Sequence, residues 1–158
     1  MKDIETYKKN GEALFLQGYN CAQSVFCTFA EEVGMDIESA FKLSSSFGGG
    51  MGRLREVCGA VSAMFMIAGL KDGYTSSNDN KIKEEHYKRI QKLAKEFELK
   101  HNTIICRELL NLKIKSDTPT PSKRTAQYYK ERPCTKFVSD ACEIIAKYLI
   151  KNNTKIEN

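Results

Sequence analysis

The fold is decided by residues 57–70, which read VCGAVSAMFMIAGL. A helix built from these residues is apolar on every side, and such a helix belongs in the centre of a domain. The stretch is too short to cross a bilayer, which takes about 20 apolar residues. We therefore predict a central buried helix at about 57–71. Gly59 and Ala63 share one face of this helix, where a second backbone could approach closely.

The chain on both sides of this stretch also shows helical periodicity. Asn20, Asp36 and Thr103 can each cap a first turn, and Pro133 can open the last helix. The additional helices that we predict cover about residues 7–17, 20–33, 36–43, 81–100, 103–112 and 133–150. No segment shows the sustained alternation of a strand. We therefore predict an all-α fold, a single-domain bundle of six or seven helices over residues 1–158.

Two segments are predicted as loops. Residues 47–52 read FGGGMG, which is too rich in glycine for regular structure. Residues 113–133 form a basic loop region, and Lys113 to Lys136 carries seven Lys/Arg against two Asp/Glu. We interpret this charge as a solvated loop, with an anionic partner or substrate as the lesser alternative. No aromatic–basic motif accompanies it, so we predict no nucleic-acid binding.

Composition and the first residues bear on the compartment. Hydrophobic residues make up 41% of the chain and charged residues 28%, and residues 1–10 are polar and charged. We predict a cytoplasmic protein without a membrane span. Because thiols stay reduced in the cytoplasm, several cysteines point to metal binding, catalysis or reversible redox chemistry more than to permanent disulfides.

The chain has six cysteines, and four of them stand where a predicted helix begins. These four are Cys21, Cys58, Cys106 and Cys134. The first turn of a helix presents free N–H groups and a partial positive charge, which favour the thiolate. Helical phase turns all four thiols inward from four different helices.

The two other cysteines, Cys27 and Cys142, do not share this pattern. Cys27 follows Cys21 by about 9 Å of helical rise, and Cys142 follows Cys134 by about 12 Å. Both separations exceed the Cα reach of a disulfide, about 7 Å. Any disulfide must therefore join different helices.

Several of these motifs together resemble a known family. GYNCAQSV at 18–25, FGGGMG at 47–52, CGA at 58–60 and the single cysteines Cys106 and Cys134 are similar to the four-cysteine redox-active protein family marked by a Cys-Gly-Ala-x-x-Gly motif. The resemblance covers about residues 7–147 and implies that Cys21, Cys58, Cys106 and Cys134 are the site residues. Ala63 stands where the motif has its last glycine. The family implies redox chemistry and no particular substrate.

The leading hypothesis is dithiol–disulfide exchange or electron transfer by a thiol-dependent oxidoreductase, with Cys21 and Cys58 as an interacting pair. This chemistry requires no cofactor. Its redox partner, a protein or a small thiol, is unknown. The exposed side of the central helix could serve a homodimer.

Three alternatives stay open. Cys21, Cys58, Cys106 and Cys134 could ligate zinc or an iron–sulfur cluster, although no close Cys-x-x-Cys pair supports this. His86 and His101 could complete such a site, but we interpret them as surface residues. The chain could instead be a non-catalytic helical interaction module with cysteines as core residues. Finally, Gly48, Gly49 and Gly50 could contact a cofactor, although we favour a permissive loop.

Overall fold

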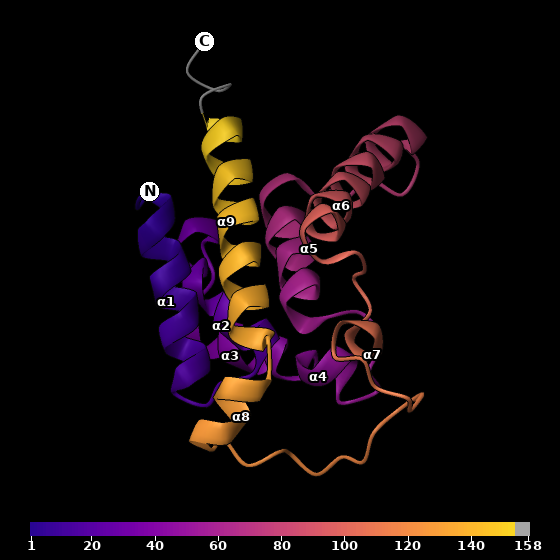
Figure 1. The fold of residues 1–158 in the computed structure, drawn as a ribbon. Coiled ribbons are helices and arrows are strands. Elements are labelled where there is room, and N and C mark those ends of the chain that lie inside the picture. The colour runs from indigo at the N-terminus through magenta and orange to yellow at the C-terminus, as the bar shows by residue number, and fades with distance from the viewer. Residues whose placement is uncertain (154–158) are drawn as a thin grey trace.

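The structure is a computed structural model that describes residues 1–153, and it confirms the all-α fold (Figure 1). The elements are α1 (Ile4–Leu16), α2 (Cys21–Thr28), the 3-10 helix η1 (Glu31–Val33), α3 (Ile37–Ser45), α4 (Gly48–Met51), α5 (Gly59–Asp72), α6 (Asn80–His101), α7 (Cys106–Leu109), α8 (Ala126–Glu131) and α9 (Cys134–Asn153). Within the described chain the only β-pairing is an isolated antiparallel bridge between Val57 and Ile105.

Helix α5 occupies the central position predicted for it. It packs against α2, α4, α6 and α9, and Figure 1 shows it between α9 and α6. Eight of its residues are buried, including Met64 and Ile67, which are fully inaccessible to solvent. The long helices α1 and α9 lie side by side and cover α2. Buried apolar residues of α1, α2, α3, α5, α6 and α9 form one continuous core.

Local hydrogen bonds explain where several helices begin. The Asn20 side chain accepts from the Gln23 N–H, and the Gln23 side chain accepts in return from the Asn20 N–H, which completes a capping box. Asp36 caps α3 in a similar way, as predicted. Thr103 does not cap a helix. Its hydroxyl accepts from the Ile105 N–H, and α7 is therefore a single short turn in place of the predicted helix over 103–112.

Three segments differ from the sequence prediction in detail. The helix expected over 20–33 ends at Thr28 and is followed by η1. The basic loop region 113–133 contains helix α8. The glycine-rich loop 47–52 contains α4, in which Gly49 and Gly50 have φ angles of 64° and 68°. Positive φ continues through Met51, Gly52 and Arg53, so this turn is left-handed. Glycine favours such a turn because a Cβ atom destabilises it. Gly49, Gly50 and Gly52 have no Cβ, whereas Met51 and Arg53 do.

No helix in residues 1–153 has both the length and the apolar character needed to cross a membrane.

Gly11 provides a test of packing between α1 and α9, and Gly69 in α5 serves for comparison. A Cβ on Gly11 would lie 2.6 Å from the Cys142 Sγ, whereas a Cβ on Gly69 in α5 would meet nothing within 4 Å. We expect Gly11→Ala to destabilise the protein by about 1–2 kcal/mol, because overpacking costs about 1–3 kcal/mol and helix propensity recovers up to about 1. Urea denaturation measures this change.

The matched control is Gly69→Ala, which should stabilise the protein by about 0.5–1 kcal/mol. Combining Gly11→Ala with Cys142→Ala removes the sulfur that the new methyl group would meet. The combined variant should lose less stability relative to Cys142→Ala than Gly11→Ala loses relative to wild type. Equal losses in the two backgrounds would show that the contact with Cys142 is not the cause.

Candidate functional site

One cavity of about 280 Å³ is lined by all four helix-start cysteines, Cys21, Cys58, Cys106 and Cys134. The structure confirms that each of them stands at a helix start, with Cys58 as the N-cap of α5 and the others as first residues of α2, α7 and α9. Residues of these helix starts, of α8 and of the loop that precedes α8 line the cavity. Figure 1 shows α8 and this loop at one end of the bundle, next to the start of α9. All six cysteines are free thiols.

Cys27 and Cys142 lie apart from this cavity, in the apolar core. Burial raises the pKa of Cys27 to about 11, and burial also raises the pKa of Cys142. Both thiols are therefore protonated at neutral pH. They behave as small core side chains, which is the common role of a buried free cysteine.

Cys21 and Cys58 line the same cavity, and the Cys21 Sγ would lie 2.7 Å from a Cβ on Gly59, the residue after Cys58. A hydrogen bond with the Cys58 thiol is the largest influence on Cys21 and lowers its pKa to about 6. The same hydrogen bond, followed by burial, raises the pKa of Cys58 well above its usual range. The two opposite pKa shifts favour the thiolate on Cys21 and the protonated thiol on Cys58. Cys21 is also partly accessible to solvent, whereas Cys58 is buried.

Backbone groups strengthen this charge separation. The backbone of Gly49, Ala22 and Gly59 hydrogen-bonds the Cys21 sulfur and lowers its pKa further. Ala22 belongs to the first turn of α2, and Gly59 to the first turn of α5. Gly49 belongs to the left-handed turn. The thiolate thus lies among N–H groups of three segments, which is the kind of environment that stabilises an anion.

Glycine is required at two points around these thiols. A Cβ on Gly59 would lie 2.7 Å from the Cys21 Sγ and 2.7 Å from the Phe47 carbonyl oxygen. A Cβ on Gly50 would lie 2.6 Å from the Cys106 Cβ. The close backbone approach predicted at Gly59 is therefore present.

Cys106 is held beside Cys58 by backbone pairing. The Cys58 N–H donates to the Ile104 carbonyl at 2.8 Å, and the Cys106 N–H donates to the Glu56 carbonyl at 2.6 Å. The Cys106 thiol also contacts the Arg55 guanidinium, with 3.6 Å between Nη1 and Sγ. Burial nevertheless outweighs this arginine and raises the pKa of Cys106.

Cys134 opens α9 and lines the same cavity. Burial is the main cause that raises its pKa to about 12, and the neighbouring Cys21 and Cys106 add to the shift. Arg132 and Arg124 act in the other direction but do not overcome burial. Cys21 is therefore the most acidic of the four cavity thiols.

The glycines predicted as cofactor contacts divide into two groups. Gly48 and Gly49 line the cavity, whereas Gly50 packs against Cys106 and Glu56. Gly48 lies against the Asn20 side chain, and a Cβ there would come within 2.4 Å of the Asn20 Cγ. The glycine segment therefore supports the Cys21 helix start as well as forming part of the cavity wall.

The prediction that both histidines are surface residues is wrong. His86 is buried, and the His101 ring lies 2.9 Å from Asp140 and packs against Phe97 and Phe137. Neither histidine lines the cavity. Among the residues that the structure describes, no group of three or more His, Cys, Asp or Glu side chains is placed to hold a metal ion.

A family model described as "Putative redox-active protein (C_GCAxxG_C_C)" matches residues 19–148. The chain belongs to this family. The match contains all four cavity cysteines and confirms the resemblance seen in the sequence. No curated protein and no solved structure matches the chain.

The cavity also contains residues that the sequence did not reveal. Its wall includes Arg53, Arg55, Arg124 and Arg132. The last two belong to the basic segment interpreted as a solvated loop, and both are half-buried in the cavity wall. The segment folds over the cavity and contributes Pro119, Pro121 and Ser122. Residue type is a sequence signal that could have identified them. The two arginines of this segment line the cavity, whereas its lysines do not.

The acidity of Cys21 can be measured by its rate of alkylation with iodoacetamide. Only the thiolate reacts, so the rate should rise with pH and level off above an apparent pKa of about 6. Cys58→Ala removes the side chain that contributes most to the low pKa of Cys21, so the midpoint of the alkylation rate should move to higher pH. Alkylation at each pH is followed by peptide mass spectrometry.

Cys27→Ala is the matched control, since Cys27 lies on the same helix but outside the cavity. Its substitution should leave the Cys21 midpoint in place. An unchanged midpoint in Cys58→Ala would show that the Cys58 thiol does not set the acidity of Cys21.

Proposed function

We propose that the protein is a thiol-dependent oxidoreductase that carries out reversible dithiol–disulfide exchange, with Cys21 as the nucleophile and Cys58 as the resolving thiol. The observation that carries this proposal is that Cys21 and Cys58 line one cavity, where the Cys21 sulfur lies against Gly59, the residue that follows Cys58. Membership of a family described as redox-active supports it.

The chemistry follows from the protonation of the pair. The Cys21 thiolate attacks one sulfur of a substrate disulfide, forms a mixed disulfide and releases the other half as a thiolate. The Cys58 thiol then loses its proton and attacks the Cys21 sulfur. The second half of the substrate leaves as a thiolate. The protein loses two electrons and holds a Cys21–Cys58 disulfide, while the substrate gains two electrons and becomes two thiols.

Cys106 and Cys134 act later in this scheme. Burial keeps both protonated, and the negative charge on Cys21 raises their pKa further. Once Cys21 is in a disulfide, that charge is gone and both thiols ionise more readily. They can then attack the disulfide and pass the oxidation to a second pair.

The cytoplasm is the compartment that suits this function. Its reducing poise returns the Cys21–Cys58 disulfide to the dithiol form, so the cycle can repeat. A partner protein or a small thiol supplies the electrons for that return.

Thiol mapping tests the proposal. Protein purified under reducing, anaerobic conditions is exposed to a mild disulfide oxidant, and remaining thiols are alkylated and identified by mass spectrometry. We expect the first product to join the Cys21 and Cys58 peptides and to return to the dithiol form with reductant. Cys21→Ser should abolish this oxidation, and Cys58→Ser should stop it at a mixed disulfide on Cys21.

Cys27→Ser provides the control and should form the same disulfide as wild type. Six free thiols after oxidation would contradict the proposal. Stoichiometric iron or zinc in the anaerobic protein would equally contradict it, and would favour the metal-binding alternative.

A further inference from the structure

The cavity that holds the thiols has the size of a small-molecule site. Its volume of about 280 Å³ lies near the lower end for ligand pockets, which are about 300–1,000 Å³. The segment before α8 closes one side of it with Pro119 and Pro121. Cys58 and Cys106 are buried, whereas Cys21 is partly exposed. The space therefore accommodates a compact molecule or one arm of a larger disulfide.

The wall of this cavity carries an excess of positive charge. Four arginines line it, and no aspartate or glutamate does. Arg53 and Arg55 share one carboxylate, Asp117, whose Oδ2 lies 2.8 Å from a guanidinium nitrogen of each. Within the described chain, Arg124 and Arg132 form no ion pair with a carboxylate. Asp117 and the Cys21 thiolate offset part of this positive charge, but the wall keeps a net positive charge.

Arg124 is held in place by neutral groups. It donates to the Phe15 and Tyr19 carbonyl oxygens at 3.4 and 3.2 Å. Its guanidinium carbon lies 4.4 Å from the centre of the Phe15 ring and 4.9 Å from that of Tyr128. A guanidinium has five N–H donors, so Arg124 keeps donors for a further acceptor. Because its position is set in advance, binding an anion requires little additional ordering.

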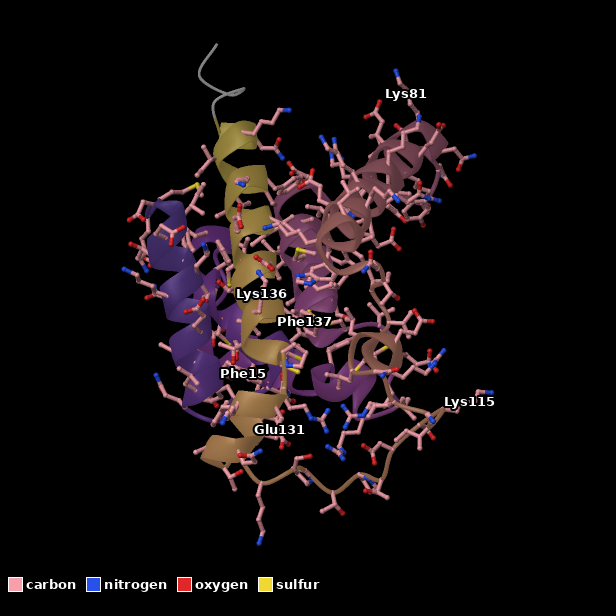
Figure 2. All side chains as sticks on the ribbon, in the orientation of Figure 1. Phe15, Lys81, Lys115, Glu131, Lys136 and Phe137 are labelled. Carbon is pink, nitrogen blue, oxygen red and sulfur yellow. The ribbon has the colours of Figure 1, made fainter. Side chains whose placement is uncertain are left out.

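Arg132 completes the cationic wall from the residue that follows α8. Its guanidinium lies 5.7 Å from the Tyr128 ring, on which Arg124 also packs. Figure 2 shows nitrogen-bearing side chains gathered between α8, α4 and the loop, whereas Lys115 points away from the bundle. The arginines do not serve mainly to ionise the nearest thiol, since the pKa of Cys134 is raised despite them. The positive charge and the unused N–H donors of these arginines suit an anionic ligand.

We propose that the cavity binds a small carboxylate-bearing disulfide, with Arg124 and Arg132 holding its carboxylates while Cys21 attacks its sulfur. This inference rests on the proposed function for its chemical step. Attack by the Cys21 thiolate forms a mixed disulfide with half of the molecule and releases the other half as a thiolate. Cys58 loses its proton, attacks the Cys21 sulfur and releases the second half, so that one disulfide becomes two small thiols.

The test compares probes that differ in charge. Reduced protein is mixed with oxidised glutathione, which carries carboxylates, or with the neutral bis(2-hydroxyethyl) disulfide, and loss of the Cys21 thiol is followed by acid quench and mass spectrometry. Arg132→Gln should slow the reaction with oxidised glutathione about 10-fold or more, because a charge-assisted pair is lost. It should change the reaction with the neutral disulfide less than about 2-fold, since that disulfide has no carboxylate.

Lys130→Gln is the matched control, because Lys130 is an exposed cation of α8 that does not line the cavity. It should react like wild type with both disulfides. Arg132→Lys keeps the charge but loses the planar pair of donors, and should give an intermediate rate with oxidised glutathione. Circular dichroism shows whether each variant is folded. Arg124→Gln provides a second test if Arg132→Gln does not fold.

Binding without exchange separates the two proposals. S-methylglutathione has the carboxylates but no exchangeable sulfur, and we expect calorimetry to show binding to wild type and about 10-fold weaker binding to Arg132→Gln. If Cys21 reacts with both disulfides but neither arginine variant distinguishes them, the inference is wrong and the proposed function stands. If S-methylglutathione binds through the arginines but Cys21 reacts with no disulfide, the proposed function is wrong and the anion site stands.

Discussion

The contact between the first turns of α2 and α5 is the constraint on which the site depends. Gly59 has no side chain, and a Cβ there would lie 2.7 Å from the Cys21 sulfur and 2.7 Å from the Phe47 carbonyl oxygen. This close approach places the Cys21 sulfur beside the start of α5, and Cys58 is the N-cap residue of that helix. Because α5 is buried in the centre of the bundle, the pair is held by the core rather than by a flexible loop.

The left-handed turn before α5 serves the same contact. Gly49 directs its backbone at the Cys21 sulfur, and Gly48 leaves room for the Asn20 side chain that caps α2. Met51, Arg53 and Arg55 also have positive φ, which is unfavourable for residues with a Cβ atom. Strained backbone of this kind persists where the surrounding structure holds it, and such places are often functional sites. Here the ion pairs of Arg53 and Arg55 with Asp117 hold the segment.

Charge and burial act in opposite directions on the four cavity thiols, and the outcome differs among them. Hydrogen bonds dominate at Cys21, whereas burial dominates at Cys106 and Cys134. One cavity therefore contains one acidic thiol and three weakly acidic ones. This division assigns the first chemical step to Cys21, while the arginines of the wall remain available to an anionic ligand.

The sequence by itself determined the helical class, the central position of α5 and the helix-start placement of the four cysteines. These features depend on apolar periodicity, capping residues and glycine or proline breaks, which act over a few neighbouring residues. The tertiary structure decided the rest. Backbone pairing of residues 55–58 with 104–107 brings Cys106 beside Cys58, and the fold of 113–133 brings Arg124 and Arg132 to the cavity. The His101 ring packs against Phe97 and Phe137 and pairs with Asp140, which belongs to α9. Such contacts join residues far apart in the chain, so no local pattern could reveal them.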